Sequence, residues 1–346
     1  MTNRKWLALL LLGVLSSPHK VVAQDDKHST TPRIEGTIRA KYEYQTEEGE
    51  GRFEVRNARV SVTGNVNPVV SYKAEIDLSD EGRIRMLDAY GRMQPWSTLR
   101  FTIGQMRVPF TIDAHRSPHL QYFANRSFIA KQVANVRDVG FTAGYTYHVG
   151  FPIVFEGGFF NGSGLTNQKD FWSKQINFSA KLQAFLPQGF YLTLSSMKTK
   201  PADVTVMHWD VGTYFHRKGL HLEAEYLLKH YGGGAFSDVH TVNTFASYDI
   251  PLRRTIFSKI SPLVRYDFMT DHSDGKRYVD LKEDATGNLI VNDYQRHRVT
   301  GGVTLSTSLP FVADIRINYE KYFYRSGAVV KPSEKDKIVV ELMTRF

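Results

Sequence analysis

The chain has 346 residues, of which 13% are aromatic and 26 are glycine, and it contains no cysteine. The lack of cysteine excludes a disulfide-held domain, so backbone pairing and packing must stabilise the fold. Basic residues exceed acidic ones by 44 to 35, a balance that favours an anionic solute or surface as partner.

The first 32 residues carry a targeting pattern. Positive charges at 4–5 precede a short apolar core at 6–15, and 21–23 (Val-Val-Ala) offer a small-residue cleavage site. This pattern is typical of a secretory signal peptide, and the core is too short to span a membrane. We therefore predict a signal peptide at 1–23 and a polar, flexible leader at 24–32. No later apolar run reaches about 18 residues, so no spanning helix is expected.

Alternation of polar and apolar residues begins at Arg33. In the segment 33–44, Ile34, Ile38 and Tyr42 share one face, while charged residues occupy the other. Such alternation predicts strands with one apolar and one polar face. Sixteen segments carry it, at 33–44, 53–64, 69–78, 84–94, 98–106, 138–148, 152–161, 174–185, 190–198, 207–217, 220–230, 239–249, 260–270, 295–306, 312–323 and 335–346.

The connections between these strands alternate in length. Those on one side are mostly tight turns, whereas the other side includes the long segments 107–137, 162–173 and 271–294. Short turns at one end and long loops at the other are typical of bacterial outer-membrane barrels. The sequence thus predicts an all-β fold, a transmembrane antiparallel β-barrel of about sixteen strands over residues 33–346. Both termini are then expected in the periplasm.

A soluble β-sandwich also has alternating strands and is the alternative fold. It does not need charges on nearly every opposite face or aromatic residues at the strand ends, which here form two girdles. The expected girdle residues are Tyr42, Tyr44, Phe159, Tyr226, Phe268, Tyr322 and Tyr324 near the long loops, and Trp96, Tyr147, Phe185, Phe190, Phe215 and Phe346 near the turns. The C-terminal Phe346 also resembles the signal that the barrel assembly machinery reads in outer-membrane proteins.

Five motifs resemble those of the phosphate-selective porin O and P family. In chain order they are 53–60 (FEVRNARV), 99–110 (LRFTIGQMRVPF), 125–128 (NRSF), 135–140 (NVRDVG) and 158–162 (GFFNG). The resemblance covers most of the chain after the leader and implies a homotrimeric, sixteen-stranded porin of the Gram-negative outer membrane. It also implies that the third external loop folds into the pore. At Asn57 the sequence departs from the family pattern, which often has a second Arg there.

The third external connection, 107–137, is strongly basic. It holds five basic residues against one acid, Asp113, which gives a net charge of +4 with His neutral. We predict that its basic residues form an anion-binding pore constriction: Arg107, Arg116, Arg126, Lys131 and Arg137. A guanidinium suits oxyanions because its donors form a fixed fork, and a narrow passage lined with one sign of charge concentrates the opposite ion. Apolar residues of the loop are expected to pack it against the wall.

Alternation also predicts basic residues on the luminal face of the barrel. These pore-wall residues are Arg39, Lys41, Arg59, Lys73, Arg92, Arg100, Lys181, Arg265 and Arg316. Two roles stay open for them, since they can contact the solute or pair with luminal acids such as Glu75 and Asp88. Asp138 is expected to pin the loop where it rejoins the wall.

Together these features predict a passive porin for small hydrophilic solutes that prefers anions, phosphate or similar oxyanions. A non-selective diffusion porin is one alternative, and a non-conducting adhesin, which a pore-folded loop disfavours, is another. A membrane-embedded enzyme is the third. The histidines are scattered without HExxH or Ser-His-Asp context, so no catalytic residue, metal or cofactor is predicted. Expected partners are the solutes, outer-membrane lipid and lipopolysaccharide, further copies of the chain and the assembly machinery, but no nucleic acid.

Overall fold

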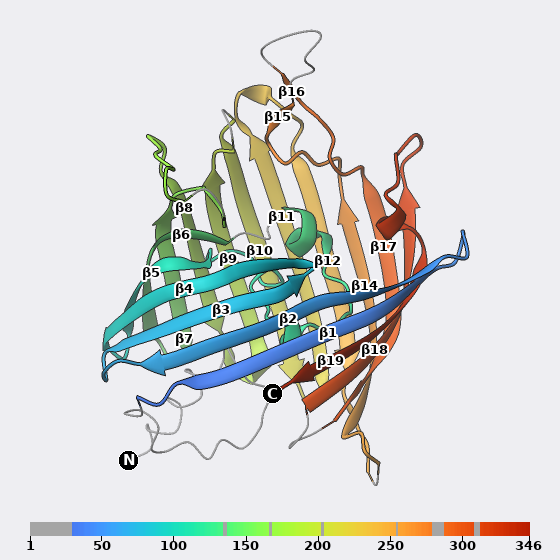
Figure 1. Cartoon of the computed structure of the whole chain (residues 1–346), viewed down its shortest axis with the longest axis horizontal. Helices are drawn as coiled ribbons and strands as arrows, with labels where there is room; N and C mark the ends of the chain where they lie inside the picture. Colours follow the sequence, from blue (N-terminus) through green and yellow to red (C-terminus); the bar gives the residue numbers. More distant parts are fainter. Residues whose placement is uncertain are drawn as a thin grey trace.

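The computed structural model describes residues 30–133, 137–165, 168–201, 204–253, 255–278, 287–307 and 312–346. Their long strands form one closed antiparallel β-barrel (Figure 1). The barrel closes because β1 (Arg33–Gln45) pairs with both β2 (Gly51–Asn65) and β19 (Lys337–Arg345). The predicted signal peptide, residues 24–29 of the leader and residues 279–286 of one external loop lie outside the described residues.

The other strands follow one another around the barrel. The long ones are β3 (Val70–Asp80), β4 (Arg83–Trp96), β5 (Leu99–Arg107), β6 (Arg137–His148), β7 (Pro152–Phe160), β8 (Asn177–Phe185), β9 (Phe190–Thr199), β10 (Val206–Arg217), β11 (Leu220–Tyr231), β12 (Val239–Tyr248), β14 (Lys259–Met269), β17 (Arg296–Ser306) and β18 (Val312–Tyr324). The two-residue strands are β13 (Ile250–Pro251), β15 (Arg277–Tyr278) and β16 (Asn288–Leu289). Short helical turns are η2 (Pro118–Leu120), η3 (Ile129–Val133), η4 (Pro187–Gly189), η5 (Gly232–Gly234) and η6 (Pro332–Glu334). Over the described ranges, no helix has the length and apolar character needed to cross a membrane.

Each of the sixteen predicted strands matches one long strand, so the predicted fold class is confirmed. The largest boundary difference, three residues, lies at the start of β8, which is predicted to begin at 174 and begins at Asn177. The alternation is a reliable guide because every wall strand has the same two environments, one on each face.

The polarity of the two faces excludes the soluble sandwich. In β1, Arg39, Lys41 and Glu43 are buried inside the barrel, whereas Ile38 is 45% exposed on the outer face. A charged interior with an apolar outer surface is the arrangement of a membrane barrel. A sandwich would bury its apolar face instead.

Three residues assigned to the aromatic girdles face the lumen instead. Phe185 shares the luminal face of β8 with Lys181 and packs on Tyr191, with ring centroids 5.3 Å apart. The other two are Tyr322 and Tyr324. Arg298 lies over the ring of Tyr322 at 5.6 Å from its centroid, and Arg296 lies over Tyr324 at 6.0 Å. Both tyrosines occupy the same face of β18 as the buried Glu320. The girdle prediction is therefore wrong at these positions, because a residue near a strand end can lie on either face of the wall.

The C-terminal residue forms backbone hydrogen bonds with the first strand, β1. The amide of Gly36 donates to the carbonyl of Phe346 at 2.7 Å, and the amide of Phe346 donates to the carbonyl of Gly36 at 3.1 Å. Gly36 lies directly under the Phe346 ring, since a Cβ at this glycine would be 2.1 Å from the ring. The C-terminal residue thus takes part in closing the barrel.

The connection between β5 and β6, named here the pore loop (107–137), folds into the interior of the barrel. In Figure 1 it is the green coil inside the strands. Its buried apolar residues pack on three parts of the wall, with Phe110 beside Met197 and Leu227, Phe123 beside Phe245 and Leu263, and Phe128 beside Met269 and Tyr322. The prediction that this external loop folds inward is confirmed.

Candidate functional site: the pore loop and the facing wall

The first half of the pore loop is bound to the wall at β8 to β11. Ser179 of β8 donates its hydroxyl to the carbonyl of Pro109 at 2.6 Å, and the amide of Thr111 donates to the Ser195 hydroxyl of β9 at 3.1 Å. The amide of Ile112 donates to the carboxylate of Glu225 in β11. These three hydrogen bonds use backbone groups of the loop and side chains of the wall.

The second half of the loop is bound to β1, β17 and β18. Arg39 of β1 donates to Gln121 Oε1 at 2.7 Å and to the carbonyl of Ala124 at 2.6 Å. The amide of Ala124 donates to Asn318 of β18 at 2.8 Å, and Arg298 of β17 donates to the carbonyl of Arg126 at 2.7 Å. The loop therefore lies along the wall from β8 round to β1.

Most of the predicted pore-wall residues are ion-paired. Arg39 and Arg316 share Glu341 at 2.6 Å each, and Arg265 pairs with Asp267 at 2.8 Å. The same holds for Lys41 with Glu43, Arg59 with Asp77, Lys73 with Asp88 and Arg100 with Glu156. Arg92 instead donates to Thr102, and Lys181 donates to the carbonyl of Thr111. Of the two roles left open by the sequence, pairing is observed for seven of the nine.

The basic residues of the pore loop fall into two groups. Arg116 pairs with Asp113 at 2.9 Å and with Glu223, and Arg137 pairs with Asp88 at 2.9 Å. Within the described ranges, Arg107, Arg126 and Lys131 have no carboxylate within 4.0 Å. Lys131 is exposed, whereas both arginines are half-buried.

Arg107 and Arg126 are held by backbone carbonyls of the same short segment. Arg107 donates to the carbonyl of His115 at 2.7 Å, and Arg126 donates to those of Ala114 at 3.4 Å and Arg116 at 3.3 Å. A carbonyl orients a guanidinium without cancelling its charge. Neither guanidinium is therefore in ion-pair contact with a carboxylate, and both are held on the segment 114–116.

The pKa values of three loop residues are lowered first by burial and second by neighbouring positive charges. Burial, followed by the charge of Arg107, holds the pKa of Arg126 well below its usual value. Burial and the charge of Arg345 lower the pKa of His119 to about 3, and burial and the charge of Lys181 keep the pKa of His115 well below its usual value. Both histidines are therefore neutral near pH 7, and the positive charge of the loop comes from its Arg and Lys residues.

Arg107 also faces a second arginine across the strand pair. It lies opposite Arg137 in the ladder of β5 and β6, where like charges repel. Arg137 is compensated by Asp88 at 2.9 Å and Glu75 at 3.4 Å, but Arg107 is not. The surplus positive charge thus lies where the pore loop leaves the wall.

Other residues that organise the site are not among the predicted constriction residues, although Asn125 lies in the NRSF motif. Gln121 and Asn125 are neutral amides, yet they connect the loop to Arg39, Lys41 and Glu320. Asp138 accepts from the amide of Gly162 at 2.6 Å and so binds the next external connection. The expectation that Asp138 pins the pore loop is wrong in this respect. In the described part of the chain, no group of three His, Asp or Glu residues is arranged to hold a metal ion.

Comparison with known proteins agrees with this architecture. Residues 33–203, which include β1 to β9 and the pore loop, match the sequence model of the family described as phosphate-selective porin O and P. Over these residues the chain belongs to that family. The resemblance stated from the five motifs is confirmed. A comparison with curated protein sequences gives no match.

Several solved structures have the same barrel fold as this porin, at low sequence identity. An anion-selective porin from Comamonas acidovorans aligns with a TM-score of 0.61 and 10% identity over 91% of this chain and 99% of that one. OmpT of Vibrio cholerae in its trimer form gives 0.55 and 13% over 91% and 98%. OmpF of Salmonella typhi, in a complex with daunomycin, gives 0.58 and 10% over 94% and 99%. These likenesses show the fold, and family and fold together make the protein an outer-membrane porin.

Proposed function

We propose that this porin is a passive channel for small hydrophilic solutes that prefers anions, phosphate and similar oxyanions among them. The observation that carries the proposal is the uncompensated pair Arg107 and Arg126 in a lumen where most other arginines are ion-paired. A guanidinium that is held by carbonyls keeps free N–H donors for an oxyanion. No catalytic role is proposed, because luminal acids such as Asp77, Asp88 and Glu341 are engaged by arginine or lysine.

The passage is inferred to run between the pore loop and the inner wall of β2 to β6. The hydrogen bonds of the loop reach β1, β8, β9, β11, β17 and β18, and this leaves the luminal side chains of β2 to β6 on the other side. That wall carries five basic residues, Arg59, Lys73, Arg92, Arg100 and Arg137, against Glu75, Asp77 and Asp88, and Arg100 also pairs with Glu156 of β7. A solute passing there meets a wall whose basic residues are mostly paired, with Arg107 at the end of β5 and Arg126 on the pore loop.

The reversal potential in a salt gradient across a planar bilayer tests the anion preference. Arg107→Gln and Arg126→Gln should each lower the chloride-to-potassium permeability ratio. One unit charge at about 4 Å in water is worth about 1 kcal/mol, which is a roughly fivefold change. Added phosphate should block the current of the wild type more than that of either variant.

Arg85→Gln is the matched control for these variants. Arg85 is 44% exposed and pairs with Asp80 at 3.2 Å beside the β3–β4 turn, and in the described part of the chain it forms no ion pair with the pore loop. Its replacement should leave the permeability ratio within experimental error. A cation-selective wild type would contradict the anion proposal, and an unchanged ratio in both loop variants would remove the loop as its source. The observed pairing of the wall would then favour a general diffusion porin.

We also propose a homotrimer with periplasmic termini, lipopolysaccharide contacts and recognition of Phe346 by the assembly machinery. The trimer form of the Vibrio cholerae neighbour supports a threefold assembly. The outer face of β1 to β4 carries small exposed residues, among them Ala40, Ala74 and Ala89, and small side chains let two walls approach closely. In native mass spectrometry from detergent, Ala89→Arg should give monomers, whereas Ala224→Arg on the outer face of β11 should leave the trimer intact. A monomeric wild type would contradict the assembly.

A further inference from the structure

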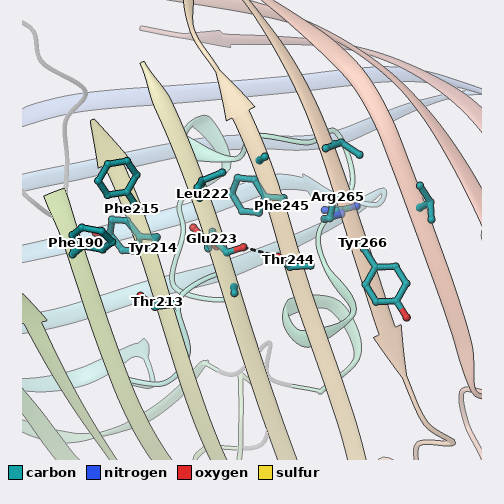
Figure 2. A pocket seen from close by; sticks show the side chains of 14 residues that line it. Phe190, Thr213, Tyr214, Phe215, Leu222, Glu223, Thr244, Phe245, Arg265 and Tyr266 are labelled. Carbon is teal, nitrogen blue, oxygen red and sulfur yellow. Dashed lines mark hydrogen bonds between the residues drawn. The ribbon is translucent and has the colours of Figure 1, made fainter. Parts of the chain in front are cut away.

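The outer face of the barrel carries a groove that crosses strands β9 to β12, β14 and β17. Its volume is about 540 Å³, and it is named here the outer groove. Figure 2 shows Phe190 and Tyr266 at its two sides, with Thr213 and Thr244 between them. Most of its lining residues occupy outward-facing positions of the strands: Phe190, Thr213, Phe215, Leu222, Ala224, Thr244, Ala246, Val264, Tyr266 and Val299.

The register of the strands explains the shape of the groove. Thr213, Ala224 and Thr244 lie opposite one another on β10, β11 and β12, and these short side chains form its floor. The next outward-facing row toward the turns holds Phe215 opposite Leu222, and these long side chains form a wall. A hydrocarbon chain in the groove contacts protein on more than one side, so it gains more van der Waals contacts than on a flat wall.

Both hydroxyl groups of the floor donate within the wall itself. Thr213 donates to the carbonyl of Tyr191 at 2.8 Å, and Thr244 donates to the carbonyl of Glu223 at 3.1 Å, the dashed line in Figure 2. Between them Ala224 adds only a methyl group. A polar guest would give up hydrogen bonds here and receive few in return, which is costly. The chemistry of the groove therefore fits an aliphatic chain.

Two cations lie at the turn end of strand β10, beside the groove. Arg217 and Lys218 are exposed, and in the described part of the chain neither has a carboxylate within 4.0 Å. Lys259, near the following turn, is by contrast paired with Asp249 at 2.7 Å. An apolar groove that ends at two unpaired cations is complementary to a molecule with a hydrocarbon chain and an anionic head.

The spacing of the two features matches the layers of a membrane. Arg217 lies opposite Leu220, and Leu220 lies opposite Tyr248, which is 49% exposed on the outer face. Aromatic residues near the strand ends mark the level of the lipid headgroups. Thr213 lies about 13 Å along the strand from Arg217. The floor of the groove is thus at the level of the acyl chains, and Arg217 is at the level of the headgroups.

We propose that the outer groove binds one acyl chain of an anionic phospholipid, whose headgroup phosphate contacts Arg217 and Lys218. The choice of a phospholipid over lipopolysaccharide rests on the proposed periplasmic side of the short turns. Strand β11 lies half-way round the barrel from β3, so the groove faces lipid in the proposed trimer. The site is independent of the proposed anion preference, since an unselective pore could bind the lipid equally well.

Native mass spectrometry of the whole barrel in detergent tests the headgroup contact, with phosphatidylglycerol or phosphatidylcholine of the same acyl chains added. The wild type should retain one phosphatidylglycerol per chain and prefer it to phosphatidylcholine by roughly fivefold for each basic residue in contact. Arg217→Gln should lower this preference without changing the retention of phosphatidylcholine. Arg85→Gln, which removes the same charge at the other end of the wall, should keep the preference. Equal retention of the two lipids by the wild type contradicts the proposal.

Substitutions in the floor test the groove. Ala224→Phe fills it and should reduce the retention of both lipids, whereas Ala180→Phe, on the outer face of β8 outside the lining, is the matched control and should leave retention unchanged. Ala224→Leu adds a smaller side chain, so it keeps the proposal testable if Ala224→Phe does not fold, and it should give a smaller reduction.

Three outcomes overturn the proposal. They are unchanged retention in both Ala224 variants, retention of added lipopolysaccharide in place of the phospholipid, and dissociation of the trimer by either Ala224 variant, which would make the groove a contact between copies of the chain. Reversal potentials of the same variants are recorded separately, so a failed lipid site and a failed anion preference are distinguishable.

Discussion

At the scale of single residues, Gly104 is a motif residue whose backbone geometry requires glycine. It is the glycine of the Ile-Gly-Gln motif, in β5, and has φ +131°. A Cβ at this position would be 2.3 Å from the carbonyl oxygen of Ala89 and 2.8 Å from Cα of Tyr90. Only glycine fits so close an approach of two backbones at positive φ.

Gly104→Ala should therefore destabilise the barrel by more than about 1 kcal/mol, since the added methyl group meets backbone atoms that cannot move aside. The measurement is urea unfolding of the refolded protein, followed by tryptophan fluorescence. Gly91→Ala is the control, because Gly91 lies on the neighbouring strand β4 and a Cβ there meets nothing within 4 Å. The control should stay within about 0.5 kcal/mol of the wild type. Equal midpoints for the two variants would show that the close approach carries no strain.

At the scale of elements, the strands could be predicted and the contacts of the pore loop could not. A strand such as β11 encodes its two faces within twelve residues, because the alternation is local. The loop depends on partners that are far away in the sequence. Arg39 is 82 residues from Gln121, and Ala124 is 194 residues from Asn318.

For the same reason, the sequence does not show which basic residues of the pore loop are ion-paired. Counting residues places Arg116 and Arg137 in one group with Arg107 and Arg126. Glu223 and Asp88 neutralise the first two, but they lie on strands that no spacing rule connects to the loop. The candidate site could thus be located from the sequence as an element, whereas its uncompensated members required the structure.

At the scale of the whole molecule, the lumen is an internal network of charges. Asp88 alone accepts from Lys73 at 2.9 Å and from Arg137 at 2.9 Å, and Glu75 lies 3.5 Å from Arg59. Such pairing holds charged side chains inside the barrel and compensates most of the basic residues of β2 to β6, although Arg92 donates to Thr102 instead. The preference for anions or cations then depends on a small net charge of the luminal side chains, and a single substitution can change this net charge.

Asp88→Asn should increase the anion preference of the channel. The substitution is nearly isosteric but removes one negative charge, so Lys73 and Arg137 share one carboxylate fewer and the passage gains one positive charge. The chloride-to-potassium permeability ratio should rise by up to about fivefold, in the direction opposite to Arg107→Gln. Reversal potentials at low salt give the clearest reading, because charges are screened within about 10 Å at 0.1 M.

The double variant Asp88→Asn with Lys73→Gln is the matched control, because it restores the net charge while keeping the altered carboxylate. Its permeability ratio should return towards that of the wild type. If the double variant instead matches Asp88→Asn alone, the effect of Asp88 comes from rearranged side chains and not from charge. If neither variant differs from the wild type, this wall does not face the conducting passage, and the solute path must lie on another side of the pore loop.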